Sequence, residues 1–362
     1  MTKQKKNKYL TKQEVDELEK QSEKYSAMAR EFKFADKPLE AEEYYKKAIE
    51  FNSKVPENYS RLGNLLKNLN RIEEAVECFK QVAKLNKPNY QDNIFVGGLL
   101  CDLIRHEEAD QYYKKAMELN PKKCCKFYAC FLFGQKKYNE AEEYFLKVIK
   151  LDNKETLAYC NLGLIYILQN KYKEAEESLN KSILIDPKYS TSYYYFGKLF
   201  LVQKKYKEAE EKLRKFADFE PTNFNSYKDL AFCLALQNKE KEAEEYYRIA
   251  LSYNPNDGDS YRNLAGILNA DNRFKEALDC YKKAINLDPY TADIGEYLYE
   301  LSIILKDQFN NYQESERYFK KVIKLNPKDE EVKRIFRNFQ LHIGKLYESE
   351  KTLKSSISNK LI

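Results

Sequence analysis

Residues 156–189 contain two stretches in which apolar residues recur with the period of an α-helix. In the first stretch, apolar or small residues lie at positions i, i+3, i+4 and i+7: Tyr159, Leu162, Gly163 and Tyr166. The polar segment LQNKYKE interrupts them, and a second stripe follows at Tyr172, Ala175, Leu179, Ser182 and Ile185. Such stripes give each helix one apolar face. Because proline cannot continue a helix, Asp186-Pro187 ends the second one. The pattern predicts two helices joined by a short turn.

The same pattern returns along most of the chain. An alanine marks the second helix at Ala41, Ala75, Ala109, Ala141, Ala175, Ala209, Ala243 and Ala277, with Ser315 in the ninth place. Successive markers are 34, 34, 32, 34, 34, 34, 34 and 38 residues apart. The turn after the second helix carries Pro121, Pro187, Pro221, Pro255, Pro289 and Pro327. A fixed period of this length is typical of a solenoid. We predict an all-α stack of nine helix-turn-helix units, with the fourth unit shortened after Pro121.

Small residues are expected where the two helices of a unit cross, because larger side chains would push the axes apart. In residues 156–189, which we take as the type unit, these residues are Gly163 and Ala175. The cognates of Gly163 are Ala29, Gly63, Gly97, Ala129, Gly197, Ala231 and Ala265. We therefore expect Gly197→Leu to destabilise the fold by about 1–3 kcal/mol through overpacking.

This arrangement resembles the tetratricopeptide repeat family. Residues 156–189 carry nearly all of the family pattern, as YCNLGLIY, AEESL and DP, and the resemblance extends over about nine repeats. It implies antiparallel helix pairs in a right-handed superhelix whose first helices line a concave groove. We predict a basic arm and lead-in helix at 1–21, repeats at 22–329, a capping helix at 330–350 and a basic tail at 351–362. Thr11 and Glu14 form a capping-box signature at the start of the lead-in helix. The helical spacing after Pro327 predicts the cap, at Val332, Ile335, Phe336, Phe339, Ile343 and Leu346.

Composition agrees with a folded, helical chain. Charged residues make up 33% and hydrophobic residues 43% of the 362, with few glycines and prolines. No apolar run approaches the roughly 18 residues of a membrane span, and no apolar segment follows the basic start, so we expect no secretory signal. These features predict a cytoplasmic protein, with cytoskeletal, ciliary or organellar assemblies left open.

The net charge of +6 comes from the two ends of the chain. Acid-free basic arms carry Lys3, Lys5, Lys6, Lys8 and Lys12 at one end and Lys351, Lys354 and Lys360 at the other. Such arms suit acidic protein surfaces, RNA or anionic lipid.

The sequence offers no site of catalytic chemistry. It has no phosphate-binding glycine loop and no metalloprotease or serine-hydrolase motif. The eight cysteines form no Cys-x-x-Cys pair, and His106 and His342 are the only histidines. The many carboxylates lie in KEAEE-type segments, which we interpret as a solvated helix face. We expect no enzyme activity, no metal and no cofactor.

The resemblance implies that the groove is lined by the second, fifth, ninth and twelfth residues of each repeat. Those positions run from charged through apolar to mixed basic, and our candidate partner-binding residues are Ile94, Cys101, Lys126, Phe133, Leu157, Cys160, Leu164, Ile167, Tyr194, Lys198, Lys228, Phe232 and Arg262. An exposed apolar strip indicates a binding surface. The alternative is a tightly wound middle that buries these side chains. Cys101, Cys130 and Cys160 step along the same face, either as a thiol cluster or as small apolar fillers.

These observations predict a non-catalytic scaffold or adaptor in a multi-protein assembly. One alternative is an adaptor for the acidic tails of chaperones, which some family members bind through a clamp of Lys, Asn and Arg. Lys228 and Asn263 match part of that clamp, but Phe232 stands at another of its positions. RNA binding remains a minor alternative, because no basic and aromatic stripe recurs in each repeat.

Overall fold

The computed structural model describes residues 11–288, 311–325 and scattered positions from 301 to 348. It divides the chain into two compact units, Met1–Asn170 (unit 1) and Lys171–Ile362 (unit 2). Every regular element in the described residues is a helix, which confirms the predicted all-α fold of repeated helix pairs. Of the predicted basic arms, only Lys12 lies within the described residues.

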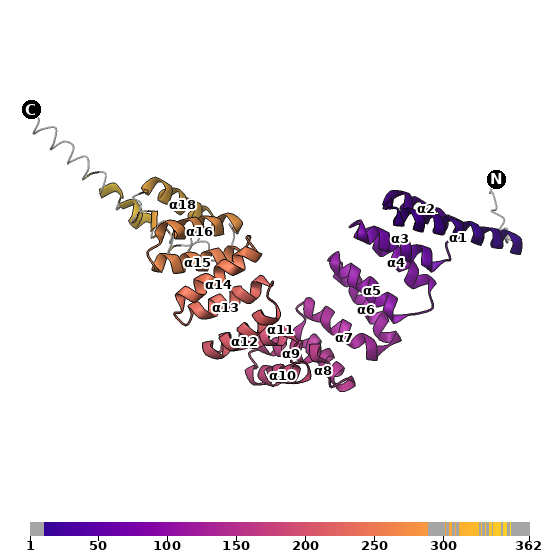
Figure 1. Cartoon of the computed structure of the whole chain (residues 1–362), viewed down its shortest axis with the longest axis horizontal. Coiled ribbons are helices and arrows are strands. Elements are labelled where there is room, and N and C mark those ends of the chain that lie inside the picture. Colours follow the sequence, from indigo (N-terminus) through magenta and orange to yellow (C-terminus); the bar gives the residue numbers. More distant parts are fainter. Residues whose placement is uncertain are drawn as a thin grey trace, which may run out of the picture. The chain divides into compact units, whose positions relative to one another are not determined.

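Unit 1 is built of consecutive antiparallel helices (Figure 1). They are α1 (Lys12–Phe34), α2 (Pro38–Phe51), α3 (Pro56–Asn68), α4 (Ile72–Leu85), α5 (Tyr90–Asp102), α6 (His106–Leu119), α7 (Pro121–Gly134), α8 (Tyr138–Leu151) and α9 (Thr156–Leu168). The predicted capping box is present, since the Glu14 N–H donates to Thr11 Oγ1 over 3.3 Å and the Thr11 N–H donates to Glu14 Oε2 over 2.7 Å. The helix that it starts, α1, runs without a break through the first helix of the first repeat.

Unit 2 continues the pattern. Its helices are α10 (Tyr172–Ile185), α11 (Ser190–Val202), α12 (Tyr206–Phe219), α13 (Phe224–Ala235), α14 (Glu240–Tyr253), α15 (Gly258–Ala270), α16 (Phe274–Leu287) and α18 (Tyr312–Leu325). Much of the predicted cap lies outside the described residues. Within them, the rings of Phe336 and Phe339 lie 5.7 and 5.0 Å from that of Phe319 in α18. In the described part of the chain, no helix combines the length and apolar character needed to cross a bilayer.

The marker alanines form the centre of the stack. All eight, and Ser315 in the ninth place, have no exposed surface. The glycines at the helix crossings are equally constrained: a Cβ on Gly63 would lie 2.8 Å from the ring of Phe79, and one on Gly197 would lie 2.6 Å from Leu213 Cδ2. The small residues are therefore set by close helix packing, as predicted.

In the first eight repeats, one residue in the left-handed region ends the first helix. These residues are Asp36, Asn70, Ile104, Lys136, Asn170, Lys204, Asn238 and Asn272, with φ between 55° and 60°. The following N–H closes the turn onto a carbonyl of the helix, for example Arg71 N to Leu66 O at 2.9 Å. This is the Schellman arrangement, in which Asn and Asp tolerate positive φ better than β-branched residues do.

The connection between α6 and α7 departs from the other repeats. Asn120 alone separates the two helices, whereas four residues connect α4 to α5 and α8 to α9. The prediction that Pro121 belongs to the turn is wrong, because Pro121 is the first residue of α7. Proline fits there because the first N–H of a helix has no partner within it. Pro121 is nevertheless the second residue after α6, as Pro187 is the second residue after α10, so the shortening lies after Pro121, as predicted.

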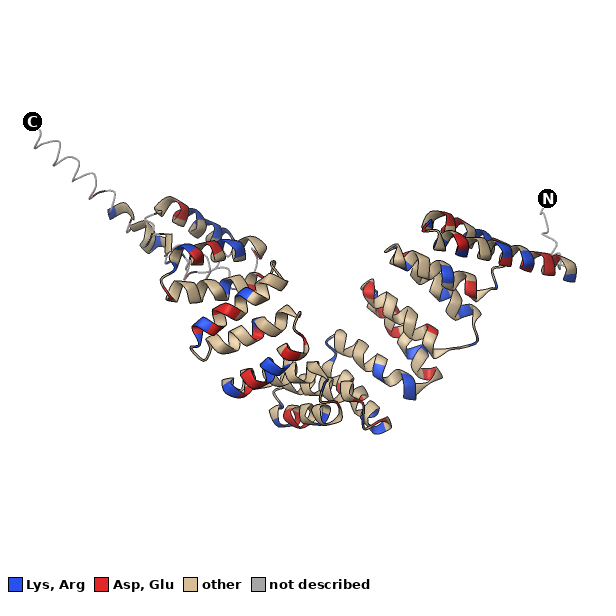
Figure 2. Ribbon diagram, viewed as in Figure 1, with Lys and Arg blue, Asp and Glu red and all other residues tan. Residues whose placement is uncertain are grey.

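Charged residues are dense on helices such as α1 and α2 (Figure 2). The interpretation of all KEAEE carboxylates as a solvated face is wrong for Glu42 and Glu210, whose side chains are only 8% and 14% exposed. Glu42 accepts two bonds from Arg71 of the next repeat, at 2.6 and 3.1 Å. These carboxylates join neighbouring repeats.

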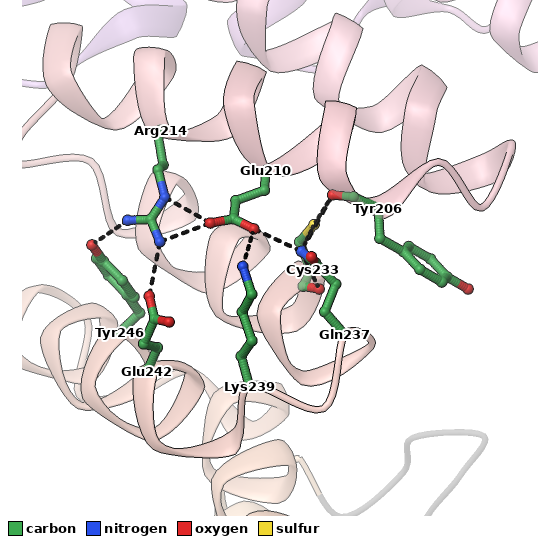
Figure 3. Close-up of polar contacts among 8 residues, drawn as sticks. All are labelled: Tyr206, Glu210, Arg214, Cys233, Gln237, Lys239, Glu242 and Tyr246. Carbon is green, nitrogen blue, oxygen red and sulfur yellow. Dashed lines mark hydrogen bonds and ion pairs between the residues drawn. The ribbon is translucent and has the colours of Figure 1, made fainter.

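Figure 3 shows the corresponding cluster in unit 2. Glu210 of α12 contacts Lys239 Nζ at 2.7 Å, Gln237 Nε2 at 2.8 Å and Arg214 at 2.8 Å. Arg214 also contacts Glu242 of α14 at 2.9 Å. Burial by itself would raise the pKa of Glu210, but the hydrogen bonds from Lys239, Gln237 and Arg214 outweigh it and lower that pKa to about 2. The cluster ties α12 to α14.

Candidate partner-binding site

A groove of about 540 Å³ opens between α5 and α7 in unit 1. The carboxyl end of α8 and the connection from α8 to α9 complete its wall. Its lining residues are Tyr90, Gln91, Ile94, Phe95, Lys122, Lys123, Lys126, Phe127, Val148, Leu151, Asp152 and Glu155. The groove therefore combines apolar side chains with charged groups of both signs.

The apolar part of the groove is open to solvent. Phe95, Phe127 and Leu151 are 39%, 43% and 45% exposed. Phe95 is held by an edge-on contact with the Phe79 ring, at 4.6 Å between centroids. Large apolar side chains gathered in one concavity are the usual mark of a ligand or partner surface.

Lys122 and Lys123 lie on the rim of the groove. They occupy the first turn of α7, which contains no acidic residue. The positive end of the helix dipole disfavours cations there. Lys123 Nζ lies 5.6 Å from the centre of the Tyr90 ring. In the part of the chain that the structure describes, no carboxylate forms an ion pair with either lysine, so both remain available to an acidic group.

Lys126 has a different environment from the rim lysines. Its Nζ lies 3.1 Å from Glu155 Oε2, on the opposite wall of the groove. This ion pair links α7 to the start of α9 and offsets the lysine charge. Of the residues predicted for partner binding, Ile94 and Lys126 are the two that line this groove.

The other candidates in unit 1 differ in accessibility. Cys160 and Ile167 are buried, while Cys101, Phe133, Leu157 and Leu164 are half-buried. Neither of the two predicted alternatives, an exposed strip or a buried one, holds throughout, because these side chains are buried or half-buried and none is fully exposed. The role of these residues in partner binding stays a prediction.

Burial raises the pKa of two of the three thiols on this face. Burial raises the pKa of Cys130 to about 11, and burial also raises the pKa of Cys101. Among the described residues, no group of three or more His, Cys, Asp or Glu side chains has an arrangement that could hold a metal ion.

The predicted basic stretch in unit 2 is offset by carboxylates. Lys198 Nζ lies 2.8 Å from Asp229, and Lys228 Nζ lies 3.0 Å from Asp257 and 3.3 Å from Asp259. Arg262 lies 3.9 Å from Asp259. Tyr194 is half-buried beneath Lys198, with 5.2 Å from Nζ to the ring centre, and Phe232 is exposed. Lys198 and Lys228 therefore link neighbouring first helices, whereas the Arg262–Asp259 contact lies within α15.

Sequence reasoning missed Phe95, Phe127 and Leu151. The two phenylalanines occupy the sixth position of their repeats, next to the fifth position that the resemblance placed in the groove. Leu151 belongs to a second helix, which the resemblance did not place there. The signal that could have found them is phenylalanine in two consecutive repeats where the type unit has Asn161.

Comparisons with known families identify the repeat. Profiles described as tetratricopeptide repeat match residues 56–89, 102–123, 127–155, 156–189, 237–292 and 295–329. Together these segments cover more than half of the chain. A search of the curated proteins gave no match.

Solved structures share the fold. Pseudomonas aeruginosa PilF is 19% identical, with 66% of this chain and 99% of that chain covered and a TM-score of 0.52. PilW, a widely conserved type IV pilus biogenesis factor, is 20% identical, with 60% and 98% covered and a TM-score of 0.52. At these identities the likeness concerns the fold alone.

Proposed function

Because the chain belongs to the tetratricopeptide repeat family, we propose that it is a non-catalytic protein-binding scaffold of a multi-protein assembly. In this proposal, unit 1 holds an extended segment of a partner in the groove between α5 and α7. The proposal rests on the surface of this groove, where the exposed side chains of Phe95, Phe127 and Leu151 lie together. On its rim, Lys122 and Lys123 form no ion pair with a carboxylate in the described part of the chain.

The groove favours a segment of mixed character. A large apolar side chain of the partner would cover Phe127 and Leu151, and burying such a side chain contributes about 1.5–3 kcal/mol. A carboxylate beside it would lie near Lys122 and Lys123, where an exposed ion pair adds about 0.2–1 kcal/mol and selects the orientation. Because Lys198 and Lys228 are already paired with carboxylates, we place the site in unit 1 rather than unit 2.

The basic arms supply a second contact in this proposal. Their lysines would bind acidic surfaces of the same assembly, and the compartment proposed is the cytoplasm. A variant lacking residues 1–12 and 351–362 tests this part. It should still bind the partner through the groove, and its affinity should fall less steeply with rising salt concentration than the affinity of the full chain does.

Capture from a native lysate tests the groove. Phe127→Glu should abolish a stoichiometric complex, because it places a charge in the apolar floor. Phe34→Glu is the matched control: Phe34 is 90% exposed in the same unit and does not line the groove. A complex that survives Phe127→Glu, or that both variants lose equally, would refute the assignment of the groove.

A further inference from the structure

The outward faces of three second helices, α2, α8 and α12, carry the same charge pair. A glutamate in the sixth position of the helix pairs with a lysine four residues later: Lys47–Glu43 at 2.6 Å, Lys147–Glu143 at 2.8 Å and Lys215–Glu211 at 3.4 Å. In each pair, the charges of the glutamate and the lysine cancel. Such pairs stabilise an exposed helix by about 0.2–0.5 kcal/mol each.

Helix α18 lacks this pair. Its sixth residue is Arg317, and Lys320, Lys321 and Lys324 follow on the same exposed face at i+3, i+4 and i+7. The four side chains line a hollow of about 470 Å³ together with Tyr318 and with Asn286 of α16. Lys320 contacts Glu316 at 2.8 Å. No carboxylate among the described residues forms an ion pair with Arg317, Lys321 or Lys324, so the face carries unbalanced positive charge.

Helix stability does not account for this arrangement. The helix dipole favours a cation in the last turn, which explains Lys324. It does not explain Arg317, which lies in the middle of the helix. Arg317 and Lys321 are also like charges at i, i+4, a spacing that destabilises a helix by about the amount that an opposite pair stabilises it.

We propose that the basic face of α18, completed by Asn286, binds an acidic segment of a partner protein. The cations extend along about 10 Å of helix, given a rise of about 1.5 Å per residue. This length fits carboxylates spaced along one short peptide segment. Single-stranded RNA would need a series of aromatic platforms for its bases, whereas Tyr318 is the one aromatic side chain lining this hollow. A membrane-binding surface would present large apolar groups beside the cations, and none lines the hollow apart from Tyr318. The site lies in unit 2 and does not depend on the groove of unit 1.

The test measures the binding of a fluorescein-labelled oligoglutamate peptide to the full chain by fluorescence anisotropy at low salt. The test variant is Arg317→Glu/Lys324→Glu. It places acidic residues at helical spacing from Lys320 and Lys321, where they can pair with these lysines. We therefore expect the helix content measured by circular dichroism to be unchanged. The control variant is Lys84→Glu/Lys150→Glu, which makes the same change in net charge. Lys84 and Lys150 are exposed and occupy the position of Lys324 in α4 and α8.

We expect the test variant to weaken oligoglutamate binding by about tenfold, because two attractions are lost and two repulsions are added. The control variant should change the affinity by less than about twofold. Equal weakening by both variants would overturn the proposal, since binding would then follow net charge alone. Absence of oligoglutamate binding would also overturn it, as would binding of oligouridylate or phosphatidylserine vesicles that is as tight as that of the peptide.

Discussion

Replacing Gly197 by alanine tests whether close helix packing sets the small residues of the repeat. Gly197 lies in α11, and a Cβ there would stand 2.6 Å from Leu213 Cδ2 and 2.7 Å from Leu213 Cγ. Well-packed carbon atoms lie about 3.5–4.0 Å apart, so Leu213 or the helix would have to move by about 1 Å. Because Leu213 is fully buried in α12 and Cγ is not a flexible end, that movement disturbs the core.

The expected size of the effect combines two opposing contributions. Overpacking of a core costs about 1–3 kcal/mol, and replacing glycine by alanine within a helix stabilises it by about 1 kcal/mol. Gly266 of α15 isolates the second contribution, because nothing lies within 4 Å of its added Cβ. Gly266→Ala should therefore stabilise the protein, and Gly197→Ala should be less stable than Gly266→Ala by about 1–3 kcal/mol. Gly197→Leu should be less stable still.

Urea unfolding followed by far-UV circular dichroism measures these differences. A double mutant tests the cause. In a protein that already carries Leu213→Ala, Gly197→Ala should no longer lower the free energy of unfolding through overpacking, because the Leu213 atoms that its Cβ would meet are absent. The reasoning is refuted if Gly197→Ala stabilises the protein as much as Gly266→Ala does, or if its effect is the same with and without Leu213→Ala.

Three further predictions concern the turns, the ion cluster and the groove. Ile104→Asn should raise the free energy of unfolding by about 1 kcal/mol in urea titrations, because a β-branched residue at a φ of 59° is strained; no gain would contradict this. Glu210→Gln should lower the free energy of unfolding by about 1–2 kcal/mol at neutral pH after allowance for solvent screening. Since the pKa of Glu210 is lowered from 4.5 to about 2 in the folded protein, its contribution is complete above pH 4.5, and the difference from wild type should shrink as pH falls towards 2. Lys123→Glu should stabilise α7 by about 0.3–1 kcal/mol through the helix dipole and yet weaken partner capture; a variant that loses both stability and capture would indicate a structural role.

Much of the fold could be predicted because each structural requirement recurs in many copies of the repeat. The alanine ladder predicted a buried seam, and every marker from Ala41 to Ala277 is fully buried. The capping box was predictable because Thr11 and Glu14 interact locally. Pro121 was misplaced because a proline suits both the residue after a helix and the first residue of one. Local pattern alone does not distinguish those two positions.

The candidate site was harder to predict, since it depends on contacts between repeats. The resemblance supplied a register for groove positions, and that register found Ile94 while missing its neighbour Phe95. It also placed Lys198 and Lys228 among the partner-binding residues without their ion pairs, because their partners Asp229 and Asp257 lie in the following repeat. Glu210 was wrongly predicted to be solvated for the same reason: its hydrogen-bond partners Gln237 and Lys239 are 27 and 29 residues away in sequence.

The central claim is that a partner segment occupies the groove between α5 and α7, and photocrosslinking tests it most directly. A photoreactive amino acid would replace Phe127 in the full chain, and the same substitution at exposed Phe34 would serve as the control. After irradiation in a native lysate, the account predicts one dominant crosslinked protein from position 127, joined through a segment that contains both apolar and acidic residues, and no such product from position 34. Identical products from the two positions, or none from position 127, would contradict it.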